Sequence, residues 1–251
     1  MVADGGYAAI ELNAETLPWA PAHITPEADQ QTRREVAGAC QARGLTIPAV
    51  GAHIPMVARN IATRVSAIAF VNGCTDLARD VRAPVVHILS GPLDDGADRE
   101  EAWNWFRAAV EETTAYASAR NVTLGIEAIA GHVFHKVDDY HRLRRELPGV
   151  PFKVNFDPSH LQVQGESPLR VVDELGDQIV HVHLKDGSGH FPSFKFPPLG
   201  RGDIDFVRLV ERLRSIAYAG ALSVEYEAQV YGYHETEYQI LREGKVFVDR
   251  L

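Results

Sequence analysis

The chain has 251 residues, 45% of them hydrophobic and 24% charged, which is the composition of an ordinary globular protein with a full core. Its formal net charge of −9 excludes a general affinity for polyanions such as DNA. No apolar run reaches the roughly 20 residues needed to span a bilayer, and Cys40 and Cys74 form no disulfide framework or zinc motif. The first residues lack the features of a signal peptide, so we expect a cytoplasmic protein that binds neither nucleic acid nor membrane.

Short apolar runs alternate with longer amphipathic ones along the whole chain. The short runs, which are mostly β-branched and continuously apolar, predict parallel strands buried on both faces. These strands are predicted over Tyr7–Leu12, Thr46–His53, Pro84–Leu89, Thr123–Glu127, Phe152–Asp157, Ile179–Leu184 and Ala221–Tyr226. The amphipathic runs predict helices over about residues 26–43, 57–79, 97–120, 137–147, 168–175, 206–216 and 235–241. The first helix is expected to start at the sequence Thr25-Pro26-Glu27, which combines a capping hydroxyl, a proline and an acid.

This β-α alternation fits both an open parallel sheet and a closed barrel. Polar residues at the ends of the predicted strands favour the barrel, because only a barrel brings every strand end around one mouth. These residues are Glu11, His53, His87, Glu127, Asp157, His183 and Glu225. No linker or composition shift divides the chain, so we expect residues 1–251 to form a single TIM-type (β/α) barrel domain.

Seven strands are predicted, whereas a regular barrel has eight, so the barrel lacks its first strand and helix. Three arrangements would complete it: a further βα unit upstream of Met1, direct closure between the two edge strands, or cover by another chain. We favour the first, since residues 1–6 read as the end of a helix running into a turn. Association of copies into a homo-oligomer stays open.

Three of the strand ends carry carboxylates, namely Glu127, Asp157 and Glu225. Burying them together without a positive partner would be prohibitive. A divalent cation held by these acids and His183 resolves the repulsion, and such an oxygen-rich set suits Mn²⁺ or Mg²⁺, with Co²⁺ or Zn²⁺ as alternatives. A salt-bridge network with Lys153, Lys185 and Arg201 is the weaker alternative.

Five stretches resemble, in order and spacing, the sugar phosphate isomerase/epimerase family of xylose-isomerase-like TIM barrels. They are LGIEAIAG, VNFDPSH, VHVHLKDG, PPLGRGDIDF and LSVEYE, and the resemblance covers almost the whole chain. It implies the same four metal ligands, Glu127, Asp157, His183 and Glu225. It also implies that His160, in the D-x-x-H motif, contacts the substrate.

Further polar residues are candidates for substrate contact. Lys185 follows His183 on the same strand face and is a candidate to polarise a carbonyl group. His87, His53 and Glu11 end other strands and are predicted substrate contacts. Arg201 is the residue of its Gly- and Pro-rich loop that would reach an anionic or polyol substrate.

Two departures from the resemblance concern the substrate. Ketose 3-epimerases of the family carry a Glu six residues after the first metal Glu and an Arg six after the metal His, where this chain has Val133 and Gly189. The contacts to the far end of a sugar therefore differ. AP endonucleases carry an additional Asp-x-His pair that this acidic chain lacks, which argues against DNA as substrate.

The predicted function is proton transfer next to the carbonyl of a keto-sugar or polyol ketone, through an enediolate. Glu127 and Glu225 are the candidate bases, and His160 and Lys185 the candidate stabilisers of the enediolate oxygen. Return of the proton to carbon makes the enzyme an isomerase or epimerase, whereas loss of a hydroxyl makes it a dehydratase. A non-catalytic sugar-binding barrel is a third alternative. No phosphate-binding loop is evident, so a neutral substrate is expected.

Overall fold

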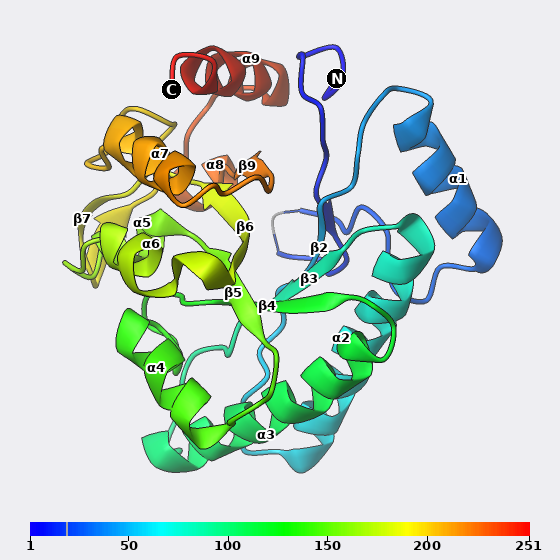
Figure 1. The fold of residues 1–251 in the computed structure, drawn as a ribbon, viewed down its shortest axis with the longest axis vertical. Helices are drawn as coiled ribbons and strands as arrows, with labels where there is room; N and C mark the ends of the chain where they lie inside the picture. The colour runs from blue at the N-terminus through cyan, green and yellow to red at the C-terminus, as the bar shows by residue number, and fades with distance from the viewer. Residues whose placement is uncertain (19) are drawn as a thin grey trace.

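A curled sheet of seven parallel strands forms the centre of the protein, as seen in a computed structural model that describes residues 1–18 and 20–251 (Figure 1). The strands follow the order β1-β2-β3-β4-β5-β6-β9 across the sheet. Their bounds are β1 Leu12–Asn13, β2 Ala49–Ala52, β3 Val85–Ile88, β4 Thr123–Glu127, β5 Lys153–Phe156, β6 Ile179–Leu184 and β9 Leu222–Val224. Six of the seven predicted strands contain an observed strand, whereas the first, Tyr7–Leu12, shares only Leu12 with β1. The barrel-type α/β architecture is confirmed.

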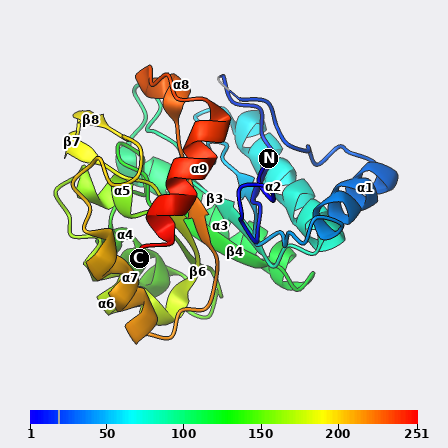
Figure 2. The same ribbon diagram turned by 90° about the horizontal axis from the view of Figure 1, so that it is seen from above.

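Helices lie on the outer side of the curled sheet and close the core against it (Figures 1 and 2). Their bounds are α1 Gln30–Gln41, α2 Ile61–Val81, α3 Arg99–Ser118, α4 Val137–Glu146, α5 Pro158–Gln162, α6 Leu169–Leu175, the 3₁₀ turn η1 Gly176–Gln178, α7 Phe206–Ser215, α8 Ala228–Tyr231 and α9 Glu237–Val248. Fully buried side chains such as Val71, Phe106 and Leu143 fill the layer between helices and sheet. The alternation of apolar runs therefore predicted both layers correctly.

The predicted start of the first helix is wrong. Helix α1 begins at Gln30, and its cap is Asp29, whose side chain accepts a hydrogen bond from the backbone of Thr32. Residues 25–28 form a turn instead, in which the backbone of Ala28 donates to the carbonyl of Thr25. The Arg33 side chain donates to the carbonyls of Pro26 and Ala28, so the turn is held against the helix rather than continued into it.

The sheet is open along one side, between the segment Tyr7–Asn13 and the segment Ala221–Tyr226, and we call this opening the seam. Strands β1 and β9 are the two edges of the sheet, and neither pairs with the other in the described part of the chain. A cavity of about 460 Å³ lies in the seam, with Glu11, Leu222 and Val224 in its wall. Direct closure of the edge strands, one of the three arrangements considered above, is therefore not what the chain adopts.

The N-terminal segment and helix α9 lie next to each other at the top of Figure 1, beside the seam. The hydroxyl of Tyr7 donates a hydrogen bond to the carbonyl of Leu241 in α9, at 2.8 Å. A Cβ on Gly244 would lie 3.1 Å from that hydroxyl oxygen and 3.2 Å from Val224, so α9 packs closely here. Helix α9 thus links the two sides of the seam.

The loop after β6 contains a hairpin that sequence patterns did not predict. Its two antiparallel strands are β7 Ser188–His190 and β8 Ser193–Lys195. The buried carboxylate of Asp186 ties the ends of this loop together by accepting backbone N–H groups from Gly187, Gly200 and Gly202, each at 2.9 Å. Gly202 is required here, because a Cβ at that position would lie 2.2 Å from an Asp186 oxygen.

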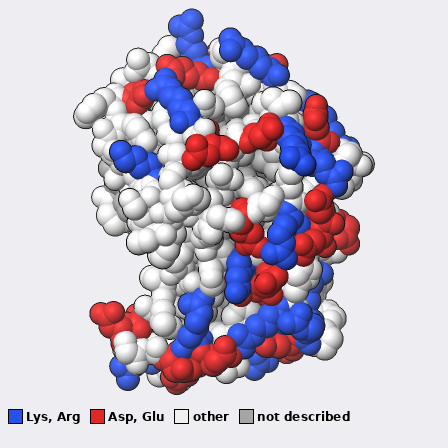
Figure 3. Space-filling view, turned by 90° about the vertical axis from the view of Figure 1, so that its left-hand side faces the viewer, with Lys and Arg blue, Asp and Glu red and all other residues white. Residues whose placement is uncertain are grey.

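The helical surface carries acidic and basic side chains side by side (Figure 3). Arg170 on α6 pairs with Asp138, Glu166 and Glu174, and Arg212 on α7 pairs with Asp173. Mixed charges of this kind are typical of a solvated surface. Among the described residues, no helix is both long enough and apolar enough to cross a membrane.

Candidate metal centre

The ligand set predicted from sequence (Glu127, Asp157, His183 and Glu225) lies at one end of the sheet. Glu127 is the last residue of β4, His183 lies near the end of β6, and Asp157 and Glu225 directly follow β5 and β9. Because the strands are parallel, their carboxyl ends meet at the same edge. One ligating atom from each of the four residues lies within 4.8 Å of all the others.

Three atoms of the ligand set are buried without a hydrogen-bond partner among the described residues: Asp157 Oδ2, His183 Nδ1 and Glu225 Oε2. His183 Nδ1 lies 2.9 Å from Glu225 Oε2 and 3.6 Å from Glu127 Oε2. Asp157 Oδ2 lies 2.9 Å from the Lys185 ammonium, so these atoms are close to charged groups without forming regular hydrogen bonds. Buried charges gathered in this way are costly unless a strong partner compensates them. Three carboxylates and one imidazole in this arrangement fit a divalent cation.

The other oxygens of the acids are fixed by neighbouring groups. Asn155 on β5 donates from its side chain to Glu127 Oε2 at 2.9 Å. Asp157 caps the short helix α5, with its Oδ1 accepting the backbone N–H of Ser159 at 2.7 Å. Burial alone would raise the pKa of Glu127, but the nearby cationic groups, His183 first, hold it well below its usual value. Glu127 is therefore held in the charged form that a cation needs.

Lys185 and His160 stand beside the ligand set. The Lys185 ammonium lies 2.9 Å from Asp157 Oδ2, 2.9 Å from Glu225 Oε1 and 3.3 Å from His160 Nε2. Burial disfavours its charge, yet the carboxylates outweigh burial and keep the pKa of Lys185 well above its usual value. His160 Nε2 lies 3.7 Å from both Glu127 and Asp157, and its ring packs edge-on against Phe196.

A cavity of about 440 Å³ opens beside these groups at the carboxyl ends of the strands, and we call it the mouth cavity. Polar side chains line one part of it: Asn13, His53, Glu127, His132, His160, Lys185, Glu225, Tyr226 and Glu227. Apolar residues such as Leu17, Leu89 and Ile129 line the rest. Its volume and its mixture of polar and apolar lining residues suit a small polyhydroxylated molecule.

The residues predicted to contact the substrate do not all reach the mouth cavity. His53 lines the mouth cavity, whereas His87 is fully buried below it and Glu11 lines the seam cavity. The β-sheet register explains this depth, since His87 lies level with Gly125, two residues before Glu127 on the same face. Arg201 lies 55% exposed and paired with Glu235 and Glu243, so the structure does not bring it to the mouth cavity.

The mouth cavity also contains residues that the sequence reasoning missed. His132 lies in the loop after β4, its Nδ1 is buried without a hydrogen-bond partner among the described residues, and burial lowers its pKa to about 4. Glu227 lies 4.0 Å from the Lys185 ammonium, and burial raises its pKa. The signal for Glu227 was present, because it follows Glu225 at the two-residue spacing that puts side chains on one face of an extended segment.

The fold and the site together define a class of protein: a parallel α/β barrel with a carboxylate-rich cluster, suited to a metal ion, at the C-terminal ends of its strands. Residues 1–246 match the family model of the xylose isomerase-like TIM barrel, and the chain belongs to that family.

Curated relatives in this family are sugar epimerases, which supports an enzyme of this kind. L-ribulose-5-phosphate 3-epimerase UlaE of Shigella flexneri is 24% identical over 186 residues, which cover 72% of this chain and 65% of that protein. D-psicose 3-epimerase of Enterocloster bolteae is 22% identical over 161 residues, covering 60% of this chain and 51% of that protein. The chain thus matches half to two thirds of the length of these relatives. Among solved structures, the IolI protein with a bound zinc atom has a similar fold, with a TM-score of 0.78 at 16% identity, covering 98% of this chain and 89% of that one.

Proposed function

We propose that the chain is a divalent-metal-dependent isomerase or epimerase that acts on a keto-sugar or a related polyol. The convergence of the ligand set on one edge of a polar, sugar-sized cavity carries this proposal. The names of the curated relatives support a sugar substrate, and the zinc atom in the IolI structure supports a metal. The oxygen-rich ligand set is suited to Mn²⁺ first, with Mg²⁺, Co²⁺ or Zn²⁺ as alternatives.

A divalent ion held by the ligand set would polarise the carbonyl group of a bound ketone and so acidify the neighbouring C–H bond. Glu127 and Glu225 come from strands on different sides of the mouth cavity and are the proposed bases, one taking the proton and one returning it. The Lys185 ammonium, already charged and buried, would donate to the enediolate oxygen. His160 would bind a neighbouring hydroxyl, and the neutral imidazole of His132 and the ring of His53 would contact the remainder of the sugar.

Deuterium exchange tests this proposal directly. The Mn²⁺-loaded protein is incubated in D₂O with a panel of ketopentoses, ketohexoses, inososes and a ketopentose phosphate, and the products are followed by NMR. We expect deuterium at the carbon next to the carbonyl of at least one neutral substrate, with an isomeric sugar as product. Incorporation accompanied by loss of water would identify a dehydratase instead. Metal binding with no exchange on any substrate would favour the non-catalytic sugar-binding alternative.

His160 provides a second test, because its assignment separates substrate contact from metal ligation. His160→Ala is expected to bind one ion per chain with unchanged affinity and to lose most of the exchange activity. General acid–base and positioning residues typically contribute about 10²–10⁴-fold to rate. Loss of the metal together with the activity would make His160 a ligand and would contradict the assignment.

A further inference from the structure

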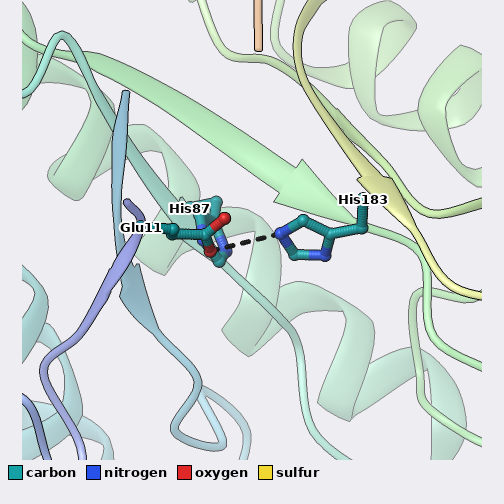
Figure 4. Close-up of side chains that lie close together, drawn as sticks. All are labelled: Glu11, His87 and His183. Carbon is teal, nitrogen blue, oxygen red and sulfur yellow. Dashed lines mark hydrogen bonds and ion pairs between the residues drawn. The ribbon is translucent and has the colours of Figure 1, made fainter. Parts of the chain in front are cut away.

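The carboxylate of Glu11 lies beside the ring of His183, one of the proposed metal ligands, as Figure 4 shows. One carboxylate oxygen of Glu11 lies 3.2 Å from His183 Nε2 and 2.6 Å from His87 Nε2, and the other lies 2.7 Å from His181 Nε2. The three imidazole side chains are 0–2% exposed, whereas Glu11 is 14% exposed because it borders the seam cavity. One carboxylate therefore contacts the ring nitrogens of three histidines, which lie on strands β3 and β6.

This contact decides which nitrogen of His183 carries the proton. A carboxylate only accepts hydrogen bonds, so Nε2 of His183 must donate to Glu11. When Nδ1, which lies 2.9 Å from Glu225 and 3.6 Å from Glu127, binds an ion through its lone pair, the single proton of the neutral ring lies on Nε2, where Glu11 accepts it. The tautomer required of a metal ligand is thus the one that Glu11 selects.

Glu11 is itself held in place by a chain of contacts. His87 bonds through its other nitrogen to His53 at 2.9 Å, and His53 bonds to Glu15 at 3.1 Å. Gly51 leaves room for this stack, since a Cβ there would lie 3.2 Å from the rings of both His53 and His87. The carboxylate of Glu11 is therefore fixed relative to β3 and β6, although it belongs to the edge segment of the sheet.

We propose that Glu11 is the positioning residue of the metal centre: it fixes the tautomer and the ring orientation of His183 and thereby raises the affinity for the ion. The inference rests on the proposed metal-dependent function and assigns Glu11 a role different from substrate contact. Outer carboxylate partners of ligating histidines typically contribute about 10–100-fold to metal affinity.

A rival interpretation makes Glu11 a metal ligand. Ligating atoms of Glu11, His87 and His183 lie within 4.8 Å of one another, which is close enough for a second ion. Both Glu11 oxygens, however, already accept hydrogen bonds from imidazoles. The observations therefore favour positioning over ligation.

The test compares metal binding by the wild type, Glu11→Gln and Glu146→Gln, with Mn²⁺ titrated by electron paramagnetic resonance and folding verified by circular dichroism. Glu11→Gln keeps the side-chain shape but loses the charge and replaces one acceptor by a donor, so its affinity should fall about 10–100-fold. Glu146→Gln is the matched control, because Glu146 accepts hydrogen bonds from Trp103 and Arg142 on the outer helices and contacts no member of the histidine network; its affinity should equal that of the wild type. In the Zn²⁺-loaded wild type, ¹⁵N NMR should show His183 protonated on Nε2, and this signal should shift in Glu11→Gln.

Three results would overturn the proposal. Equal Mn²⁺ affinity of the wild type and Glu11→Gln would remove the positioning role while leaving the metal-dependent function intact. Two ions per wild-type chain, falling to one in Glu11→Gln, would make Glu11 a ligand of a second ion. No ion bound by the wild type would overturn the positioning role and the proposed function together.

Discussion

The wall of the sheet from β2 to β6 and the seam between β1 and β9 are built from the same kind of apolar segment, yet they differ in packing. All four residues of β2 and of β3 are buried, whereas all three residues of β9 are only half-buried. The difference follows from position, since a wall strand has a neighbour on each side and an edge strand has one. Hydrophobic sequence alone therefore does not determine burial in a curled sheet.

The candidate metal centre contains residues from both regions. Glu127, Asp157 and His183 belong to the wall and have side chains exposed by 0–3%, whereas Glu225 follows the edge strand β9 and is 28% exposed. Three ligands are thus held by a packed layer and the fourth by the seam. An ion at this centre would link the two regions, and the predictions below test how far they differ.

The largest expected effect comes from replacing a leucine by alanine, once in the wall and once in the seam. Leu124→Ala in β4, where the side chain is 1% exposed, should lower the free energy of unfolding by about 2–5 kcal/mol because it leaves a cavity in a closed layer. Leu222→Ala in β9 should cost about 1 kcal/mol or less, since Leu222 already borders the seam cavity. Urea denaturation measures both values. Equal losses would mean that the seam packs as tightly as the wall.

The second prediction concerns pH and the contact that holds the segment after β1 to the end of β2. Burial alone would lower the pKa of His53, but hydrogen bonding and attraction to Glu15 outweigh it and raise the pKa from 6.5 to about 9. Because the folded pKa is raised, this stabilisation is complete below pH 6.5 and is lost as the pH rises through about 9.

In the metal-free protein, the wild type should therefore lose up to about 3 kcal/mol of stability between pH 6.5 and pH 10 relative to Glu15→Gln. Urea denaturation across this range, with EDTA present, gives the difference between the two proteins. Parallel pH profiles for both would show that the pair does not hold β1 to the wall.

Metal binding should stabilise the fold by bringing seam and wall together. At a Mn²⁺ concentration about 100 times the Kd, the free energy of unfolding should rise by about 2.7 kcal/mol. Removal of the ion with EDTA should reverse the gain, and Asp157→Asn should abolish it. Hydrogen exchange should slow in β9 on metal addition and change little in β4. Slowing in both strands alike would show that the ion does not act on the seam in particular.

The smallest expected effect compares two tyrosine hydroxyls. Tyr7 donates to Leu241 beside the seam at 2.8 Å, and Tyr140 donates to the carbonyl of Ile126 in the wall at 2.7 Å. Tyr7→Phe should cost about 0.5–1.5 kcal/mol, because water can reach the carbonyl that is left. Tyr140→Phe should cost about 1–3 kcal/mol, since the hydrogen bond that it removes is fully buried and water does not replace it. Thermal unfolding measures the loss of stability in each variant. A larger loss in Tyr7→Phe than in Tyr140→Phe would contradict the comparison.

The sequence predicted where most of the strands lie, because burial on both faces requires continuous apolar runs. It also predicted that Glu127, Asp157, His183 and Glu225 lie close together, since the carboxyl ends of parallel strands meet at one edge of the sheet. Their role as metal ligands stays a prediction. It failed at the start of α1, where Asp29 was a better cap than Thr25. Hairpin β7–β8 was missed because it has no apolar face to reveal it, with most of its residues exposed.

How far a side chain lies below the mouth cavity was harder to predict than which strand carries it. Residues two apart share a face, but one lies a layer deeper, and only the register between strands tells which. For this reason Glu11 and His87 looked like residues of the mouth cavity and instead lie below it. Arg201 belongs to a loop whose course depends on contacts with α9, which no local pattern reveals.

The hydrogen bonds that Asp186 accepts from Gly187, Gly200 and Gly202 have a consequence for the whole loop. Its base is anchored at Asp186, and its hairpin is held a second time where the backbone of Phe191 donates to the carbonyl of Val163 at 2.7 Å. The hairpin brings Phe194 against Phe196, next to the mouth cavity residue His160. One buried aspartate therefore holds together a loop that meets the mouth cavity twice, at Lys185 directly before it and at His160 through Phe196.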